Sequence, residues 1–124
     1  MYTLEDFKEE VTKTKAKMEE LAAYLKTIDA AVKKQLESWN LDGCVKRLQE
    51  YMIPEMEKLL QQVETGALPL KHRRNRLRSY YYIIDSWPCM SKPDRNKNPK
   101  IWDRIEEVGA MLSHLNRHYR NDLA

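Results

Sequence analysis

The sequence predicts an all-α protein, an antiparallel four-helix bundle that forms one domain over residues 1–124. Apolar residues recur at helical spacing along four segments, and residues that end helices separate these segments. The chain has three glycines and five prolines, which is little material for the turns of a sheet protein. Its hydrophobic fraction of 42% can build one modest core, so a single helical domain is expected.

The first predicted helix is long and continuous, from residue 4 to residue 39. Its apolar positions follow alternating steps of three and four residues, which is the a/d spacing of heptads. These positions are Leu4, Phe7, Val11, Thr14, Met18, Leu21, Leu25, Ile28, Val32, Gln35 and Trp39. Thr3 and Asp6 predict an approximate capping box, and NLDGC at 40–44 predicts the end. Because so long a helix would extend beyond its neighbours, a homodimer through it is a further expectation.

The second predicted helix begins with Asp42 as its N-cap and runs to Thr65, where Gly66 offers a left-handed closing residue. Its apolar stripe contains Val45, Leu48, Met52, Met56, Leu59 and Val63. Pro54 lacks the N–H of a regular helical residue, so we expect a kink near Ile53, or two shorter helices in place of one.

The third predicted helix begins near Pro69, ends at Trp87 and opens with a strongly basic stretch. Residues 71–78, KHRRNRLR, contain five Lys or Arg and one His, and three tyrosines follow at 80–82. Cations at the N-terminal end of a helix oppose its macrodipole and typically cost a few tenths to about 1 kcal/mol each. A bound phosphate or acidic partner would compensate, and so would glutamates of the first two helices. An ordinary solvated basic run is the third interpretation.

A polar connection over 88–99 precedes the fourth predicted helix. Asn98 predicts its N-cap, and Pro99 is a favoured residue of the first turn. Its buried face is predicted to contain Ile101, Ile105, Val108, Leu112, Leu115 and Tyr119. Gly109 lies beside that face and predicts the close approach of another helix.

The two halves of the chain differ in charge. Residues 1–66 contain 10 Lys or Arg and 13 Asp or Glu, a balance of −3, whereas residues 67–124 contain 12 and 6, a balance of +6. This distribution directs an anionic partner toward the second half.

These patterns predict a non-enzymatic binding protein that contacts the backbone of RNA or single-stranded DNA with little sequence readout. Bases stack on aromatic side chains beside basic ones, and no helix-turn-helix signature favours a major-groove reader. The predicted contact residues are Lys71, His72, Arg73, Arg74, Arg76, Arg78, Tyr80, Tyr82, Lys92, Arg95, Lys97 and Lys100. The alternative is a protein-interaction module, an inhibitor or adaptor, that docks the same helix on an acidic protein surface, because Arg and Tyr also dominate interface energetics.

The string RNRLRSYYY at 74–82 resembles part of the motif of the HEPN superfamily. These are helical-bundle ribonucleases and nucleotidyltransferase partners in which an Arg-polar pair is followed four residues later by His and then by Tyr. The matching residues are Arg74, Asn75 and Tyr81. Ser79 stands where the catalytic His would be, so the resemblance implies no acid/base group for RNA cleavage.

No other motif predicts catalysis, and we expect neither a cofactor nor a metal. His114 and His118 have the i, i+4 spacing of a helical metal pair, but Glu107 lies too far along the helix to complete a site. Cys44 and Cys89 are single and predict reduced thiols. The acidic N-terminus is unlike a secretory signal and no run is long and apolar enough to cross a membrane, so a cytoplasmic location is expected.

Overall fold

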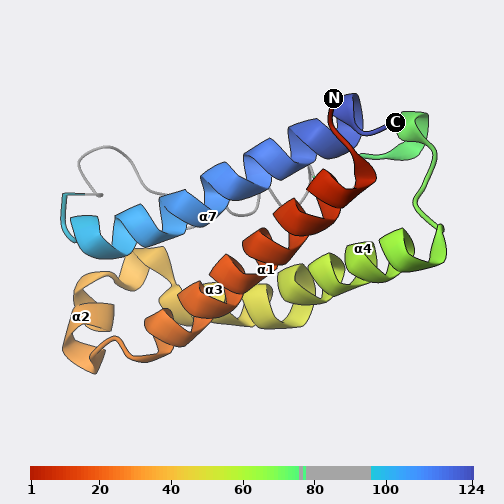
Figure 1. The fold of residues 1–124 in the computed structure, drawn as a ribbon. Helices are drawn as coiled ribbons and strands as arrows, with labels where there is room; N and C mark the ends of the chain where they lie inside the picture. Colours follow the sequence, from red (N-terminus) through yellow and green to blue (C-terminus); the bar gives the residue numbers. More distant parts are fainter. Residues whose placement is uncertain (76, 78–95) are drawn as a thin grey trace.

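The computed structural model describes residues 1–75, 77 and 96–124, and these residues form helices and turns with no strand among them (Figure 1). Within these ranges, every helix is too short or too polar to span a lipid bilayer. The elements, with η marking a short 3-10 or π turn, are α1 (Leu4–Lys26), α2 (Ala30–Gln35), η1 (Glu37–Trp39), α3 (Leu41–Arg47), η2 (Leu48–Met52), α4 (Ile53–Thr65), η3 (Lys71–Arg73), α7 (Pro99–Arg117) and η4 (His118–Asp122).

Helix α1 ends at Lys26, so the prediction of one continuous helix to residue 39 is wrong. The Thr27 hydroxyl donates to the carbonyl of Tyr24 (2.7 Å), a local hydrogen bond that competes with continuation of the helix. Asp29 then has an extended backbone with ψ of 146° and precedes α2. The chain turns back through α2 and η1, and this turn places Trp39 in the core (Figure 1).

The N-cap of α3 is Asn40 and not the predicted Asp42. Asn40 has a left-handed backbone (φ 48°), which asparagine tolerates better than most residues, and its side chain accepts a hydrogen bond from the Gly43 N–H (3.2 Å). Asp42 lies two residues farther, in the exposed first turn of α3, where Lys33 pairs with it (2.9 Å). Because the chain reverses direction at this point, a residue that accepts a positive φ is needed one position before Leu41.

A wide π turn, η2, lies between α3 and α4 immediately before Pro54. The N–H of Ile53 donates to the carbonyl of Leu48, five residues earlier, where an α-helix would use the carbonyl four residues earlier. The wider turn relieves the clash that a proline ring makes with the preceding helical turn. The chain therefore has two helical segments here, and the angle of the predicted kink stays a prediction. Gly66 closes α4 with φ of 69°, as predicted.

Helix α1 contacts both α4 and α7, and it runs in the opposite direction to each of them (Figure 1). Near the start of α1, Phe7 stacks on Tyr119 (5.4 Å between ring centroids), and farther along Lys17 pairs with Glu107 (3.2 Å). The buried residues of α1 are Phe7, Val11, Thr14, Met18, Leu21, Ala22 and Leu25. They are covered within one chain, so the overhang that motivated the homodimer is missing, and the dimer itself stays a prediction.

The predicted ends of α1 and α7 are confirmed. Thr3 and Asp6 form a reciprocal capping box at distances of 2.9 and 3.1 Å, and the hydrogen bond from the Thr3 backbone N–H lowers the pKa of the Asp6 carboxyl. Asn98 caps α7 by accepting from the Ile101 N–H (3.2 Å). The predicted face of this helix is buried as expected: Ile101, Ile105, Val108, Leu112, Leu115 and Tyr119.

The prediction that a third helix opens near Pro69 is wrong for the residues that the structure describes. Leu70 is extended (φ −58°, ψ 146°), residues 71–73 form one 3-10 turn, and Arg74 leaves helical geometry (φ −88°, ψ 75°). Residues 71–74 therefore do not form the first turn of an α-helix. The rest of the predicted helix, apart from Leu77, lies outside the described residues.

Candidate functional site

The candidate site lies at the end of the molecule where both chain ends meet the basic stretch. The two termini and residues 66–75 lie together at the right-hand end of Figure 1. The turn η3 packs against η4, the π turn that continues α7. This contact joins segments about 45 residues apart in the sequence, as the Arg74–Tyr119 hydrogen bond illustrates.

Arg74 is the residue that ties these segments together. Its side chain is 7% exposed, and its Nε donates to the carbonyl of Pro69 (2.7 Å). Its terminal nitrogens donate to main-chain oxygens of Tyr119 (3.3 Å), Leu123 (2.6 Å) and Ala124 (3.0 Å). We call these four hydrogen bonds the Arg74 clasp. Four of the five N–H donors of this guanidinium are used within the fold, so the structure assigns Arg74 a role in positioning the turn.

The end of the last helix is a favourable place for a buried cation. Carbonyls in the final turn of a helix have no partner within the helix, and together with the macrodipole they give that end a partial negative charge. Arg74 supplies N–H donors to these oxygens in a fixed fork, and its guanidinium also lies 5.5 Å from the centre of the Tyr119 ring. The partners of Arg74 are thus main-chain oxygens and not the glutamates that were expected.

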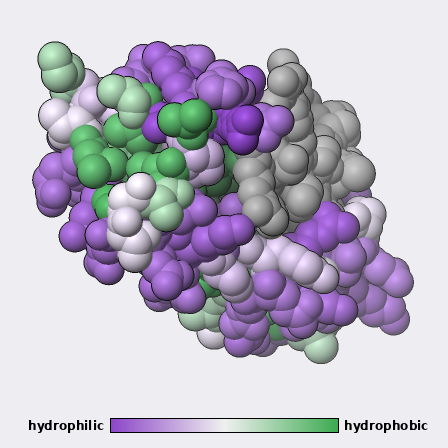
Figure 2. Space-filling view, turned by 90° about the vertical axis from the view of Figure 1, so that its right-hand side faces the viewer, coloured by the Kyte–Doolittle hydropathy of each residue, from purple (hydrophilic) through white to green (hydrophobic). Residues whose placement is uncertain are grey.

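The three basic residues before Arg74 are exposed. Lys71, His72 and Arg73 make no side-chain hydrogen bond or ion pair within the part of the chain that the structure describes. The N–H of Arg73 donates to the Leu70 carbonyl (2.8 Å), which fixes the turn. We call Lys71–Arg73 the basic turn. Leu70 beside it is 66% exposed, and Figure 2, which looks at this end, shows hydrophobic side chains gathered beside hydrophilic ones.

A second set of contacts fastens η4 to α1. The Tyr2 ring stacks on His118 (4.4 Å between centroids), and both residues bond to the Glu10 carboxylate, at 3.2 Å from the Tyr2 hydroxyl and 2.7 Å from the His118 Nδ1. Asp122 lies 3.8 Å from the His118 Nε2. Partial burial, followed by the negative charge of Glu10, raises the pKa of the Tyr2 hydroxyl well above its usual range.

The other predicted contact residues are not all near the basic turn. Lys97 and Lys100 lie at the start of α7, at the opposite end of this helix from η4. From Lys100 to His118 the helix rises by about 27 Å at 1.5 Å per residue. Six predicted contact residues lie outside the described residues: Arg76, Arg78, Tyr80, Tyr82, Lys92 and Arg95. The site that can be built therefore consists of the basic turn and the residues packed around it.

His114 and His118 each contact another side chain. His114 lies 3.2 Å from Arg117, and His118 is held by Glu10. Across residues 1–75, 77 and 96–124, no three His, Cys, Asp or Glu side chains lie together as metal ligands. Cys44 is a buried free thiol whose pKa is raised by burial, and Cys89 lies outside the described residues.

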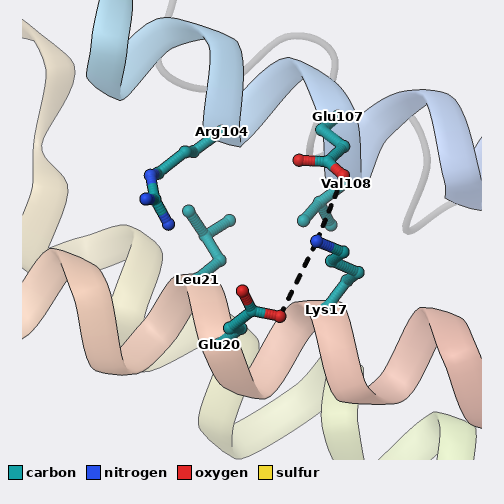
Figure 3. Close-up of a pocket in the computed structure, with 6 residues that line it drawn as sticks. All are labelled: Lys17, Glu20, Leu21, Arg104, Glu107 and Val108. Atoms are coloured by element: carbon teal, nitrogen blue, oxygen red, sulfur yellow. Dashed lines mark ion pairs between the residues drawn. The ribbon is translucent and has the colours of Figure 1, made fainter.

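One pocket lies between α1 and α7, and its charges are satisfied internally (Figure 3). Lys17 reaches from α1 toward Glu107 on α7 (3.2 Å) and also toward Glu20 (3.7 Å). Arg104, which lines the pocket from α7, lies with its guanidinium 4.1 Å from the centre of the Tyr24 ring. The cations of this pocket already have partners, which argues against a ligand there.

A second pocket opens beside the basic turn. It has a volume of about 210 Å³ and lies between α4, residues 69–77 and Tyr119. Its lining residues are Glu55, Lys58, Leu59, Gln62, Pro69, Arg73, Asn75, Leu77 and Tyr119. Lys58 and Arg73, the two cations among them, make no ion pair within the described ranges. We call this space the α4 pocket.

The sequence analysis missed the contribution of α4 to this site. Lys58 and Gln62 belong to the acidic half of the chain, residues 1–66, so the charge distribution did not indicate them as contact residues. Glu55, Lys58 and Gln62 recur at i, i+3 and i+7, so they share one helix face, and this spacing was the available signal. The sequence did not indicate that residues 69–77 would lie across that face.

Comparisons with protein families, with curated proteins and with solved structures find no match to this chain.

Replacing Arg74 with Met should destabilise the protein by about 3 kcal/mol, because a hydrogen bond to a charged group contributes roughly 1.5–3 kcal/mol and buried carbonyls would lose their donor. The matched control is Arg73→Met, one residue away, which should change the free energy of unfolding by about 0.5 kcal/mol or less because the side chain is exposed. Urea unfolding measures both variants. Equal losses of stability would contradict the assignment of the clasp to Arg74.

Stability should fall as the pH rises above about 10, the ordinary pKa of tyrosine. The folded protein raises the pKa of Tyr2, so the stability linked to its proton is present below that pH and is lost above it. Tyr2→Phe should flatten this alkaline loss in urea unfolding between pH 8 and 11. Tyr51→Phe, at an exposed tyrosine, should keep the wild-type slope, and an unchanged slope in Tyr2→Phe would refute the explanation.

Proposed function

We propose that this protein binds nucleic acid, RNA or single-stranded DNA, by contacting the phosphate backbone with the basic turn. The observation that carries the proposal is the contrast between adjacent cations. Arg74 is buried and donates four hydrogen bonds to main-chain oxygens, whereas Lys71, His72 and Arg73 face solvent without a partner among the described residues. Since phosphates are the most common ligands of exposed Lys and Arg clusters on nucleic-acid-binding proteins, the turn is suited to an anionic strand.

The Arg74 clasp supports this proposal because it fixes the turn. A flexible basic segment loses conformational entropy when it binds, and a turn that is already held loses less. The fork of Arg74 holds the chain at Pro69 on one side of the turn and at the end of α7 on the other. Lys71 and Arg73 are therefore presented from a supported backbone.

The finer form of the fold is part of the same proposal. We propose an antiparallel four-helix bundle in which Pro54 kinks the second helix. The opposite direction of α1 to both α4 and α7 supports this arrangement (Figure 1). Most of the predicted third helix lies outside the described residues. The protein acts without catalysis and in the cytoplasm.

The second candidate function is an inhibitor or adaptor that docks on an acidic protein surface. Leu70 favours it, because a leucine that is 66% exposed beside three basic residues suits an interface with an apolar centre and an acidic rim. Nucleic acid remains the first choice, since the described part of the turn offers Lys71 and Arg73 as cationic side chains, with His72 between them, beside one large apolar side chain.

Filter binding of a single-stranded RNA across a salt series tests the proposed function. Affinity should fall steeply with salt, and the variant with Lys71→Gln and Arg73→Gln should bind more weakly. Its log–log salt slope should be shallower by about 1.4, because each lost phosphate contact removes about 0.7 from the slope for single strands.

The matched control is the variant with Lys34→Gln and Lys46→Gln, which removes two exposed cations from α2 and α3 and should bind like the wild type. Binding that is absent at low salt, or equal slopes for both double variants, would rule out the basic turn as the contact surface. A protein partner that stays bound after nuclease treatment would favour the adaptor.

A further inference from the structure

We infer that the α4 pocket holds one nucleotide of the bound strand, with the base inside the pocket and its phosphate at the mouth. This inference rests on the proposed function and adds a specific site to it. The basic turn connects the two, because Arg73 belongs both to the exposed turn and to the lining of the pocket.

The pocket is closed at its floor and cationic at its mouth. Leu59, Leu77 and Tyr119 are buried, with at most 3% of their surface exposed, so they close the floor and present little surface of their own. Lys58 and Arg73 are exposed and lie at the mouth. A concave space with a few polar groups around it is typical of small-molecule sites.

The side-chain amides of Gln62 and Asn75 suit the edge of a base. A carboxamide both donates and accepts hydrogen bonds, as base edges do. Gln62 projects from α4 and is half-buried, whereas Asn75 follows the Arg74 clasp on the opposite wall. The two amides thus approach the pocket from different elements.

The charge of the lining places the phosphate outside. Glu55, which is 8% exposed and already has an interaction within the fold, brings a carboxylate to the pocket. An anion deep inside would meet this carboxylate, whereas an anion at the mouth would meet Lys58 and Arg73. Lys58 and Arg73 therefore favour a ligand, such as a nucleotide, whose negative charge lies at one end and can stay at the mouth of the pocket.

The size of the pocket limits the ligand to one small group. Sites that bury drug-sized ligands have volumes of roughly 300–1,000 Å³, and the α4 pocket has about 210 Å³. This space suits one base and not a larger cofactor. Single-stranded nucleic acid offers such a group, because its unstacked bases can turn away from the backbone into a pocket.

The test adds nucleoside 5′-monophosphates to the ¹⁵N-labelled full-length chain and follows the side-chain amide signals of Gln62 and Asn75 by NMR. Both signals should shift, and a monophosphate should compete with a labelled single-stranded RNA. Lys58→Gln should weaken mononucleotide binding about tenfold or more, since a lost charge-assisted contact has that effect. Lys46→Gln, an equal change of charge on α3, should leave it unchanged.

The outcomes separate the pocket from the proposed function. RNA that binds with a steep salt slope while mononucleotides neither shift the amide signals nor compete would overturn the pocket and leave the function intact. Inorganic phosphate that competes as well as a monophosphate would also overturn it, because no base would then be involved. Mononucleotides that bind in the pocket while RNA does not bind would support the pocket and refute the proposed function.

Discussion

One buried guanidinium determines how this end of the molecule is built. The final turn of the last helix leaves main-chain oxygens that need donors, and Arg74 supplies them across a large separation in sequence. A buried cation normally has a high desolvation cost, which here is offset by four hydrogen bonds and by the negative end of the helix. Without this residue, nothing else among the described contacts would hold residues 69–75 against α7 by hydrogen bonds from a side chain.

The clasp explains why one basic stretch contains two kinds of cation. Arg74 is buried, and its N–H groups bond to main-chain oxygens. Lys71 and Arg73, in the turn before it, are exposed to solvent. The same geometry places Arg73 opposite Lys58 of α4. A backbone-contact surface and a small pocket are thus consequences of one anchoring interaction. The Tyr2, Glu10 and His118 contacts support the arrangement from the other side, because they fasten the start of η4 to α1.

Local patterns predicted most of the helical structure. The apolar faces of α1 and α7, the capping box at Thr3, the Asn98 cap and the Gly66 closure depend on residues within a few positions of each other, and these predictions are confirmed. The prediction failed where local and tertiary demands differ. The heptad pattern continues past Lys26, but the Thr27 hydroxyl bond and the burial of Trp39 turn the chain. Asp42 is a good capping residue, but the residue that adopts the left-handed backbone before the helix, and caps it, is Asn40.

The sequence predicted which basic residues cluster at the site, but not how their side chains are arranged. The sequence shows a cluster of cations, and it cannot show that Arg74 alone faces inward, because its acceptors are main-chain oxygens that carry no sequence signal. Nor does it show that Lys58 and Gln62 of an acidic segment face the basic turn. The comparison of Arg73 with Arg74 makes the point plainly, since identical neighbouring residues have opposite environments.

The most direct test of the account is the exchange rate of the arginine Nε–H protons with water, measured by NMR on the unmodified protein. The Nε–H of Arg74 is buried and bonded to the Pro69 carbonyl, so its proton should exchange far more slowly than that of exposed Arg73. Equal and rapid exchange at Arg73 and Arg74 would show that the clasp does not hold in solution, and the structural basis for the basic turn would be lost.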